Sequence, residues 1–171
     1  MSITHTTIDT PLAELTLVAD GGLLCGVYYP GHWTRPDRAA FGARTDHGFE
    51  AVERQLAEYL AGERTSFELA TRAAGDEFQQ RVWAAIARIP YGQTTTYGEI
   101  ARELGDPQLA REVGAATGRN PLSLIVPCHR VLGKGGRLTG YAGGLARKQR
   151  LLELEGAVVP EPAGDAALAL F

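Results

Sequence analysis

A cysteine, a histidine and an arginine follow one another directly at the end of an apolar run in the second half of the chain. They are Cys128, His129 and Arg130, and they stand after Pro127. A thiolate is the reactive form of cysteine, and a nearby base and cation favour it. Neighbouring side chains on an extended strand point to opposite sides, so His129 can assist Cys128 only where the backbone turns or a water bridges them. The pattern indicates a nucleophilic cysteine, although a cysteine that only fills a core is the commoner case.

The segment before this run predicts a helix-turn-helix, with helices over 96–104 and 108–117 joined by a turn that contains glycine. The second helix carries mainly small side chains, among them Ala110 and Gly114, and Arg111 is its long basic residue. Such a helix can approach a nucleic-acid backbone in a narrow groove, and an arginine on it can fill the space left by a displaced base. An ordinary helical corner with a solvated Arg111 remains the alternative.

The first half of the chain predicts a sheet and a helix. Residues 1–30 alternate like strands around a hairpin turn at Asp20-Gly21-Gly22. Apolar residues at helical spacing predict an amphipathic helix over 49–60, and a short strand is expected over 66–69. A helix over 76–89, capped by its first residue, opens the second half.

The charge of the chain changes where this second helix begins. The 171 residues carry a net charge of −3, but residues 78–150 hold 11 Lys and Arg against 4 Asp and Glu, a local net charge of +7. Residues 1–77 are net −6 and residues 151–171 net −4. We therefore expect a domain boundary at Gly75. A basic segment in an acidic protein suits a polyanion as partner, and a solvated basic surface is an equal alternative on charge alone.

Composition excludes several classes of protein. With 44% hydrophobic and 22% charged residues, the chain is neither disordered, collagen-like nor a coiled coil. No apolar run is long enough to span a bilayer and the N-terminus lacks a signal-peptide pattern, so we expect a cytoplasmic protein without a membrane partner. The two cysteines lie about a hundred positions apart and exclude a disulfide framework. The four histidines lack metal-ligand spacing, so no metal is expected.

Several spaced blocks together resemble one family. These are the string PCHRV at 127–131, Asn-Pro at 120–121, GYAGG at 140–144 and LLELEG at 151–156. In this order they resemble the O6-alkylguanine-DNA alkyltransferases, also called methylated-DNA–protein-cysteine methyltransferases. The resemblance runs from about Phe78 to Gly156, and TIDTP near the N-terminus resembles the start of that family's first domain.

The resemblance implies both a fold and an activity. The fold would be an α/β, ribonuclease-H-like N-terminal domain over 1–75, a mainly α C-terminal winged helix-turn-helix domain over 76–160, and a tail over 161–171. The activity would be DNA repair by direct reversal, in which one alkyl group passes irreversibly from O6-alkylguanine to Cys128 in a single turnover. The partner would be double-stranded DNA bound through its minor groove by a monomer without a cofactor. Activity on O4-alkylthymine and cooperative binding along DNA stay open.

The resemblance also implies roles for single residues. Cys128 matches the alkyl acceptor, His129 the group that takes the thiol proton through a water, and Glu155 the carboxylate that orients the histidine. Asn120 matches the asparagine that braces the turn bearing the cysteine. Tyr97 matches a tyrosine that donates toward the flipped guanine and crowds the target phosphate.

Other matched residues would contact DNA or the base. Arg111 matches the arginine that enters the stack and pairs with the orphaned cytosine, and Ala110 and Gly114 lie on the same helix. The residues that would line the base pocket are Val131, Tyr141 and Ala142. The zinc site of some relatives has no counterpart, and Arg130 is expected to be structural.

Three alternatives stand beside this interpretation. A base-binding relative without catalysis would lack the acceptor cysteine, whereas Cys128 is present. A transcriptional regulator would use the helix-turn-helix to read a preferred sequence. A cysteine hydrolase would turn over repeatedly, which a thioether product does not allow.

Overall fold

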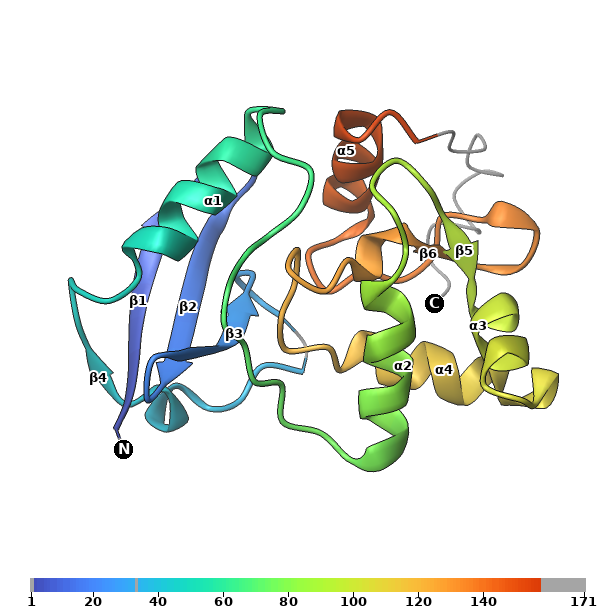
Figure 1. Ribbon diagram of the computed structural model, residues 1–171, viewed down its shortest axis with the longest axis horizontal. Helices are drawn as coiled ribbons and strands as arrows, with labels where there is room; N and C mark the ends of the chain where they lie inside the picture. Colours follow the sequence, from blue (N-terminus) through green and yellow to red (C-terminus); the bar gives the residue numbers. More distant parts are fainter. Residues whose placement is uncertain (1, 33, 158–171) are drawn as a thin grey trace. The chain divides into compact units, whose positions relative to one another are not determined.

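The chain is seen in a computed structural model that describes residues 2–32 and 34–157, so the tail expected over 161–171 lies outside the described residues (Figure 1). The chain divides into two compact units. The first holds the residues up to Ala74 together with Pro121–Ser123, and the second holds Gly75–Asn120 and the residues from Leu124 onward. Within the described ranges, no helix has the length and apolar character that crossing a membrane requires.

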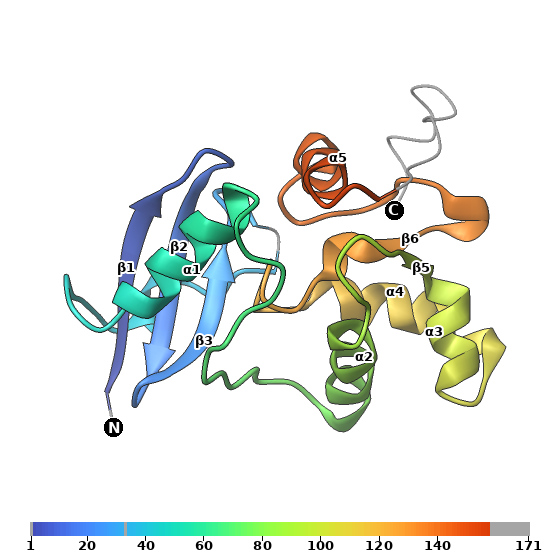
Figure 2. The same cartoon turned by 45° about the horizontal axis from the view of Figure 1, so that its top comes forward.

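The first unit is a four-stranded sheet with one helix, which crosses one face of the sheet (Figures 1 and 2). Its elements, in chain order, are β1 (Ile3–Asp9), β2 (Glu14–Asp20), β3 (Leu23–Tyr28), β4 (Ala43–Arg44) and α1 (Glu50–Leu60). The strand order is β3-β2-β1-β4, with β4 parallel to β1 and the other pairs antiparallel. The predicted hairpin is confirmed, since Gly21 and Gly22 both take the positive φ that a two-residue loop of this kind requires.

The core of the first unit lies between the sheet and α1. Leu15 and Leu17 alternate on β2 and are fully buried, as period-two patterning requires. Leu56 and Tyr59, at helical spacing on α1, are also fully buried. The amphipathic helix predicted over 49–60 is therefore confirmed, and it ends before Gly62.

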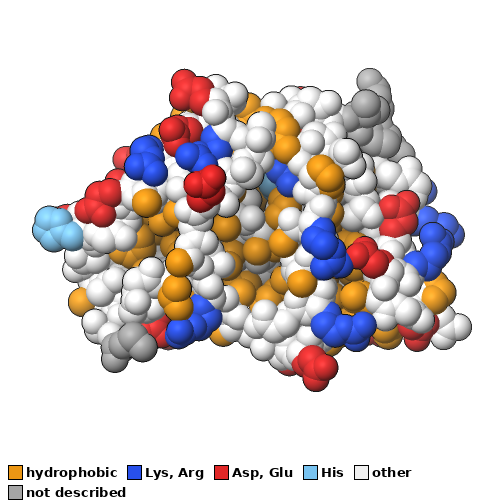
Figure 3. All heavy atoms as spheres, in the orientation of Figure 1, with side chains coloured by type: hydrophobic (Ala, Val, Ile, Leu, Met, Phe, Trp, Pro, Cys, Tyr) orange, Lys and Arg blue, Asp and Glu red, His pale blue; other side chains and the backbone are white. Residues whose placement is uncertain are grey.

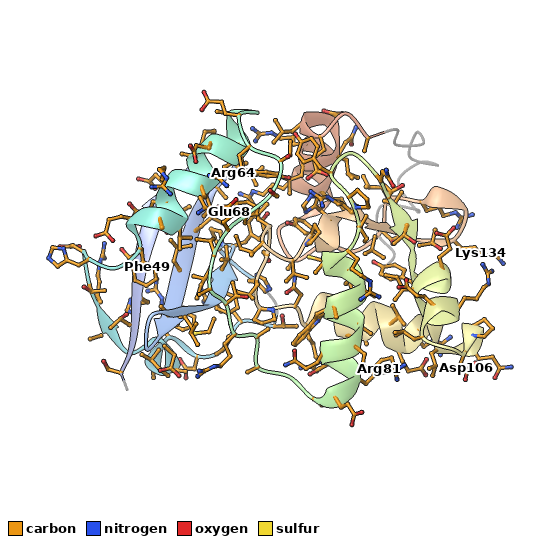
Figure 4. The ribbon with its side chains drawn as sticks, viewed as in Figure 1. Phe49, Arg64, Glu68, Arg81, Asp106 and Lys134 are labelled. Carbon is orange, nitrogen blue, oxygen red and sulfur yellow. The ribbon has the colours of Figure 1, made fainter. Side chains whose placement is uncertain are left out.

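The strand predicted over 66–69 is wrong. The amide of Gln55 on α1 bonds the backbone of Glu68 in both directions: Glu68 N–H donates to Oε1 at 2.8 Å, and Nε2 donates to the Glu68 carbonyl at 3.1 Å. Figure 4 shows Glu68 close beside α1. A side chain thus satisfies the backbone groups that a strand neighbour would have satisfied. Pairing with the sheet comes later, where Thr71 bridges Leu24 of β3.

The second unit is mainly helical. Its helices are α2 (Glu77–Ala87), α3 (Tyr97–Glu103), α4 (Ala110–Gly118) and α5 (Leu145–Leu154). Asp76 caps α2 in a capping box with Gln79, as the sequence predicted for its first residue. The helix-turn-helix is formed by α3 and α4. The second helix begins later than predicted, because Pro107–Leu109 form a separate 3₁₀ turn.

Two short strands precede the loop over 133–139, which we call the wing. β5 (Thr95–Thr96) pairs in parallel with β6 (Val131–Leu132). A loop follows β6 with a 3₁₀ turn at Lys134–Gly136, and Leu132 and Leu138 on either side of this turn pack against Leu152 of α5. On the other side, α2 packs against α4, where the indole N–H of Trp83 donates to the Ala116 carbonyl at 2.8 Å. The segment 128–130, which leads into β6, lies against α5.

Replacing Gln55 by leucine is expected to lower the free energy of unfolding by about 1–3 kcal/mol, because two part-buried hydrogen bonds between Gln55 and the Glu68 backbone are lost. Urea denaturation measures this loss. Arg54→Leu on the same helix is the matched control, since the Arg54 side chain is 64% exposed and its loss is expected to change stability by less than about 0.5 kcal/mol. Equal losses in the two variants would contradict the role assigned to Gln55.

Candidate active site

The backbone turns sharply at the cysteine. The Cys128 N–H donates to the Val126 carbonyl at 2.8 Å across Pro127, whose φ of −80° and ψ of 64° are those of an inverse γ-turn. Cys128–Arg130 then form one turn of 3₁₀ helix. The Asn120 side chain donates to the same Val126 carbonyl at 3.0 Å, so one acceptor ties the end of α4 to the turn. The backbone here meets the condition under which His129 can assist Cys128.

The loop that leads into the turn carries backbone strain. Leu124 has a φ of 73°, and among the described residues it is the one non-glycine residue with a positive φ. Its side chain is nevertheless buried. A left-handed conformation costs a residue with a Cβ roughly 1–2 kcal/mol, so the surrounding packing must hold it.

A buried ion network lies behind the cysteine. His129 Nε2 is 2.8 Å from Glu155 Oε2, and both side chains are completely buried. Arg130 holds the same carboxylate with two parallel bonds, Nε to Oε1 and Nη2 to Oε2, each 2.8 Å long. Glu155 stands at the C-cap of α5, so this network joins the end of that helix to the turn bearing Cys128.

Burial sets the protonation of the cysteine and the histidine. Burial raises the pKa of the Cys128 thiol, while its hydrogen bond with Asn120 and the charge of Lys148 act in the opposite sense. Burial lowers the pKa of His129. The hydrogen bond with Glu155 and the charge of that carboxylate raise this pKa, whereas the charge of Arg130 lowers it. Thiol and imidazole are therefore both neutral in the resting protein. A proton must leave the thiol when the nucleophile is needed.

Lys148 is a site residue that the sequence analysis missed. Its side chain is fully buried, and Nζ donates to the carbonyls of Val131 at 2.7 Å, Thr139 at 2.5 Å and Gly140 at 3.2 Å. Burial lowers the pKa of Lys148 to about 8. The signal was available, because Lys148 stands three and four positions from the apolar residues Leu151 and Leu152 on the inner stripe of α5.

A hollow of about 840 Å³ opens between the helix-turn-helix and the wing. Tyr97, Ala110 and Arg111 line one side, and wing residues that include Lys134 and Arg137 line the other. Burial raises the pKa of the Tyr97 hydroxyl, and its hydrogen bond with Thr139 opposes this rise. Tyr97 is the first residue of α3 and lines this hollow.

A small residue of α4 lies on the side that faces α3. A Cβ built on Gly114 would lie 4.0 Å from the Tyr97 ring, so α3 and α4 are close together at this point. Arg111 is exposed, and Lys134 lies at the outer edge of the unit (Figure 4). On the face that Figure 3 presents, basic and acidic side chains are mixed over the helical unit, so the local charge of +7 does not form one patch there.

The three residues expected to line a base pocket flank the ion network. Val131 is buried at the start of β6, and the Tyr141 ring meets His129 edge-on at 6.4 Å between centroids. Ala142 follows in the turn before α5 and is partly exposed. All eleven site residues predicted from the sequence belong to the second unit. Over residues 2–32 and 34–157, no group of three or more His, Cys, Asp or Glu side chains is arranged to hold a metal ion.

Comparison with known proteins gives one family for both units. The model described as "6-O-methylguanine DNA methyltransferase, DNA binding domain" matches residues 77–157, and the model of the same family's ribonuclease-like domain matches residues 3–73. A methylated-DNA–protein-cysteine methyltransferase of Mycobacterium tuberculosis (strain H37Rv) is 48% identical over 166 residues, which cover 92% of this chain and 95% of the relative. The chain belongs to the 6-O-methylguanine DNA methyltransferase family. The expected fold class, ribonuclease-like followed by DNA-binding, is confirmed.

Further members of the methyltransferase family agree in sequence and structure. A methylated-DNA–protein-cysteine methyltransferase from Methanosarcina acetivorans is 55% identical over 108 residues, which cover 63% of this chain and 69% of the relative. The crystal structure of Mycobacterium tuberculosis OGT in complex with DNA superposes with a TM-score of 0.83 at 45% identity, covering 96% of this chain and 98% of that one. The family resemblance recognised in the motifs therefore extends over the whole described fold.

Replacing Lys148 by methionine is expected to lower the free energy of unfolding by about 1.5–3 kcal/mol, because three backbone carbonyls lose a charged donor. Thermal or urea denaturation at neutral pH measures the effect. Arg150→Met is the control, as it removes a positive charge from an exposed position on the same helix. A Lys148→Met protein as stable as the unmodified one would show that the three bonds contribute nothing net.

Proposed function

We propose that this methyltransferase-family protein repairs DNA by moving the alkyl group of O6-alkylguanine onto its own Cys128. The observation that carries the proposal is the placement of a buried thiol on a turn whose next residue, His129, is bonded at 2.8 Å to the buried Glu155. The close relatives are named for the same transfer to a protein cysteine. The protein acts in a single turnover, because water does not resolve a thioether.

The reaction is an in-line displacement at the alkyl carbon. The Cys128 proton passes through a water to His129, and Glu155 stabilises the imidazolium that forms. The thiolate sulfur forms a bond to the alkyl carbon as the bond from that carbon to guanine O6 breaks. The electron pair of the broken bond stays on guanine, toward which the Tyr97 hydroxyl donates. Guanine N1 then takes up a proton, and the imidazolium of His129 releases the one it received, so that the thiol proton is balanced by the proton on guanine. The products are S-alkylcysteine and unmodified guanine.

The damaged base must leave the duplex before this step. Cys128 is 7% exposed, and a thiolate so deeply placed cannot reach O6 inside a base stack. We place the DNA against the hollow of about 840 Å³ that Tyr97, Arg111 and the wing line. Arg111 enters the stack from α4 and occupies the vacated space opposite cytosine, while Ala110 and Gly114 let this helix approach the minor groove closely.

The remaining assignments follow from this mechanism. Val131, Tyr141 and Ala142 line the pocket for the flipped base, and Asn120 holds the turn in place. Double-stranded DNA is the partner, bound by a monomer in the cytoplasm with little sequence preference and without a cofactor. The functional division is an N-terminal domain over 1–75 and a DNA-binding, catalytic domain over 76–160.

Incubation with a duplex that contains one O6-methylguanine is expected to add one methyl group to the protein and no more. Intact mass spectrometry measures the addition, and peptide mapping locates it on Cys128. Cys128→Ser is the control and gains no methyl group. Tight binding to the lesion without a mass change would instead identify a damage-recognition protein, and neither binding nor transfer would favour a transcriptional regulator.

Replacing Arg111 by alanine is expected to slow repair of duplex DNA by about tenfold or more. The reason is that no side chain then fills the vacated space and offsets the few kcal/mol that flipping the base costs. Reaction with free O6-benzylguanine needs no flipping and keeps its rate. Single-turnover kinetics on the two substrates measures the contrast. Arg119→Ala, another exposed arginine after the end of α4, is the control for loss of charge alone. Equal slowing on both substrates would remove the role given to Arg111.

A further inference from the structure

Arg130 binds the active-site carboxylate more completely than a structural salt bridge requires. Its Nε and Nη2 each lie 2.8 Å from a different oxygen of Glu155, and its Nη1 donates to the Ile89 carbonyl at 2.7 Å. The guanidinium carbon also lies 5.7 Å from the centre of the Tyr91 ring. Its side chain is only 9% exposed. The guanidinium is therefore fixed in orientation on three sides.

This arrangement occupies Glu155 from several directions. A carboxylate offers about four lone-pair sites. Arg130 takes two of them, His129 Nε2 takes one at 2.8 Å, and the backbone N–H of Gly92 approaches Oε1 at 3.5 Å. A carboxylate held by four N–H groups is strongly favoured in its ionised form. Glu155 therefore stays an acceptor and does not share a proton with the histidine.

An obligate acceptor fixes the tautomer of the histidine. An ionised carboxylate has no proton to give, so His129 Nε2 must carry the hydrogen of their 2.8 Å bond. In a neutral imidazole the other nitrogen, Nδ1, then holds the basic lone pair. The network thus determines which nitrogen receives the proton that leaves Cys128.

The charges around His129 also determine its protonation. The groups that face it are Glu155 at the end of α5, Arg130 and Cys128 on the same 3₁₀ turn, Lys148 on α5, and the edge of the Tyr141 ring. With a neutral imidazole and a neutral thiol, the charged members are two cations and one anion. Protonation of the imidazole alone would add a third buried cation. Loss of the thiol proton to His129 leaves the net charge unchanged, so the network opposes the first event and permits the second.

Building on the proposed alkyl transfer, we propose that Arg130 is a positioning residue for that reaction. By occupying both oxygens of Glu155, it keeps His129 neutral and in the tautomer that can accept the Cys128 proton. Without the guanidinium, an uncompensated carboxylate 2.8 Å away would favour the imidazolium, and His129 would already be protonated near neutral pH. The positive charge of Arg130 therefore sets the lowest pH at which the thiol can be activated.

The test compares the pH profile of the single-turnover rate between the unmodified protein and variants of Arg130. The substrate is free O6-benzylguanine, so that the salt and pH dependence of DNA binding does not enter the measurement. Arg130→Met removes the charge, and Arg130→Lys keeps a charge but loses the paired geometry. Arg130→Met combined with Glu155→Gln removes both charges. The midpoint of the acid limb is expected to rise by about one pH unit or more in Arg130→Met, because an unopposed neighbouring charge moves a pKa by about 1–3 units. Below that midpoint the rate falls about tenfold per unit.

The other two variants separate charge from structure. In Arg130→Lys the midpoint is expected to stay near that of the unmodified protein, with a lower rate at every pH. In the double variant it returns to the unmodified value or falls below it, because the carboxylate that raised it is gone. An unshifted midpoint in Arg130→Met, an equal shift in Arg130→Lys or a raised midpoint in the double variant would each overturn the proposal. A uniform rate loss without a shift would make Arg130 purely structural.

Nitrogen-15 spectra of the His129 ring supply a measurement that needs neither activity nor a stable Arg130 variant. In the unmodified protein at pH 6.5, the ring is expected to be neutral with its hydrogen on Nε2. A protonated ring, or a hydrogen on Nδ1, would overturn the proposal even if Arg130→Met does not fold. Failure of the unmodified protein to react with any O6-alkylguanine would refute the proposed function while leaving the spectra to decide the role of Arg130.

Discussion

The second unit depends on one buried carboxylate. Glu155 stands where α5 ends, and Arg130 and His129 both bind it from the turn that carries the cysteine. Removing one member of a buried ion pair leaves an uncompensated charge and costs about 3–5 kcal/mol, whereas replacing both members with apolar groups is often neutral. Such a network therefore contributes little net free energy to folding, but it fixes the relative positions of the groups that it joins. It admits one relative placement of α5 and the turn at Cys128–Arg130, and that placement is also the one that the proposed proton transfer requires.

Lys148 applies the same logic to the wing. Its ammonium group donates hydrogen bonds to carbonyls of β6 and of the loop that returns to α5, namely those of Val131, Thr139 and Gly140. An apolar residue in its place could fill the space but could not satisfy three acceptors. The buried cation thus determines the path of the wing. The wing in turn forms one wall of the hollow, and Tyr97 and Arg111 line the other wall.

Much of this architecture was predictable from local pattern, and the failures have physical causes. The hairpin at Gly21 and Gly22 and the cap at Asp76 follow from rules that act over a few residues, and both were predicted. The strand expected over 66–69 failed because Gln55, thirteen positions before Glu68, satisfies its backbone, and no local pattern records such a bond. Glu155 alone would have been taken for a surface residue. Only the family resemblance joined it to His129, because their contact spans 26 positions of sequence.

The small residues of α4 show why a recognition helix need not read bases. Its inner side is fixed by Trp83, whose indole bonds the Ala116 carbonyl, and by Thr117, whose hydroxyl returns to the Val113 carbonyl at 2.7 Å. The exposed side of α4 carries the long side chains of Arg111 and Glu112 together with small residues. Such a helix offers few donors for base edges, and phosphate contacts carry no sequence information. In the proposed function, discrimination must therefore come from the pocket that receives the flipped base. The residues that are joined to one another by buried hydrogen bonds, His129, Arg130 and Glu155, accordingly lie next to Cys128 and not along α4.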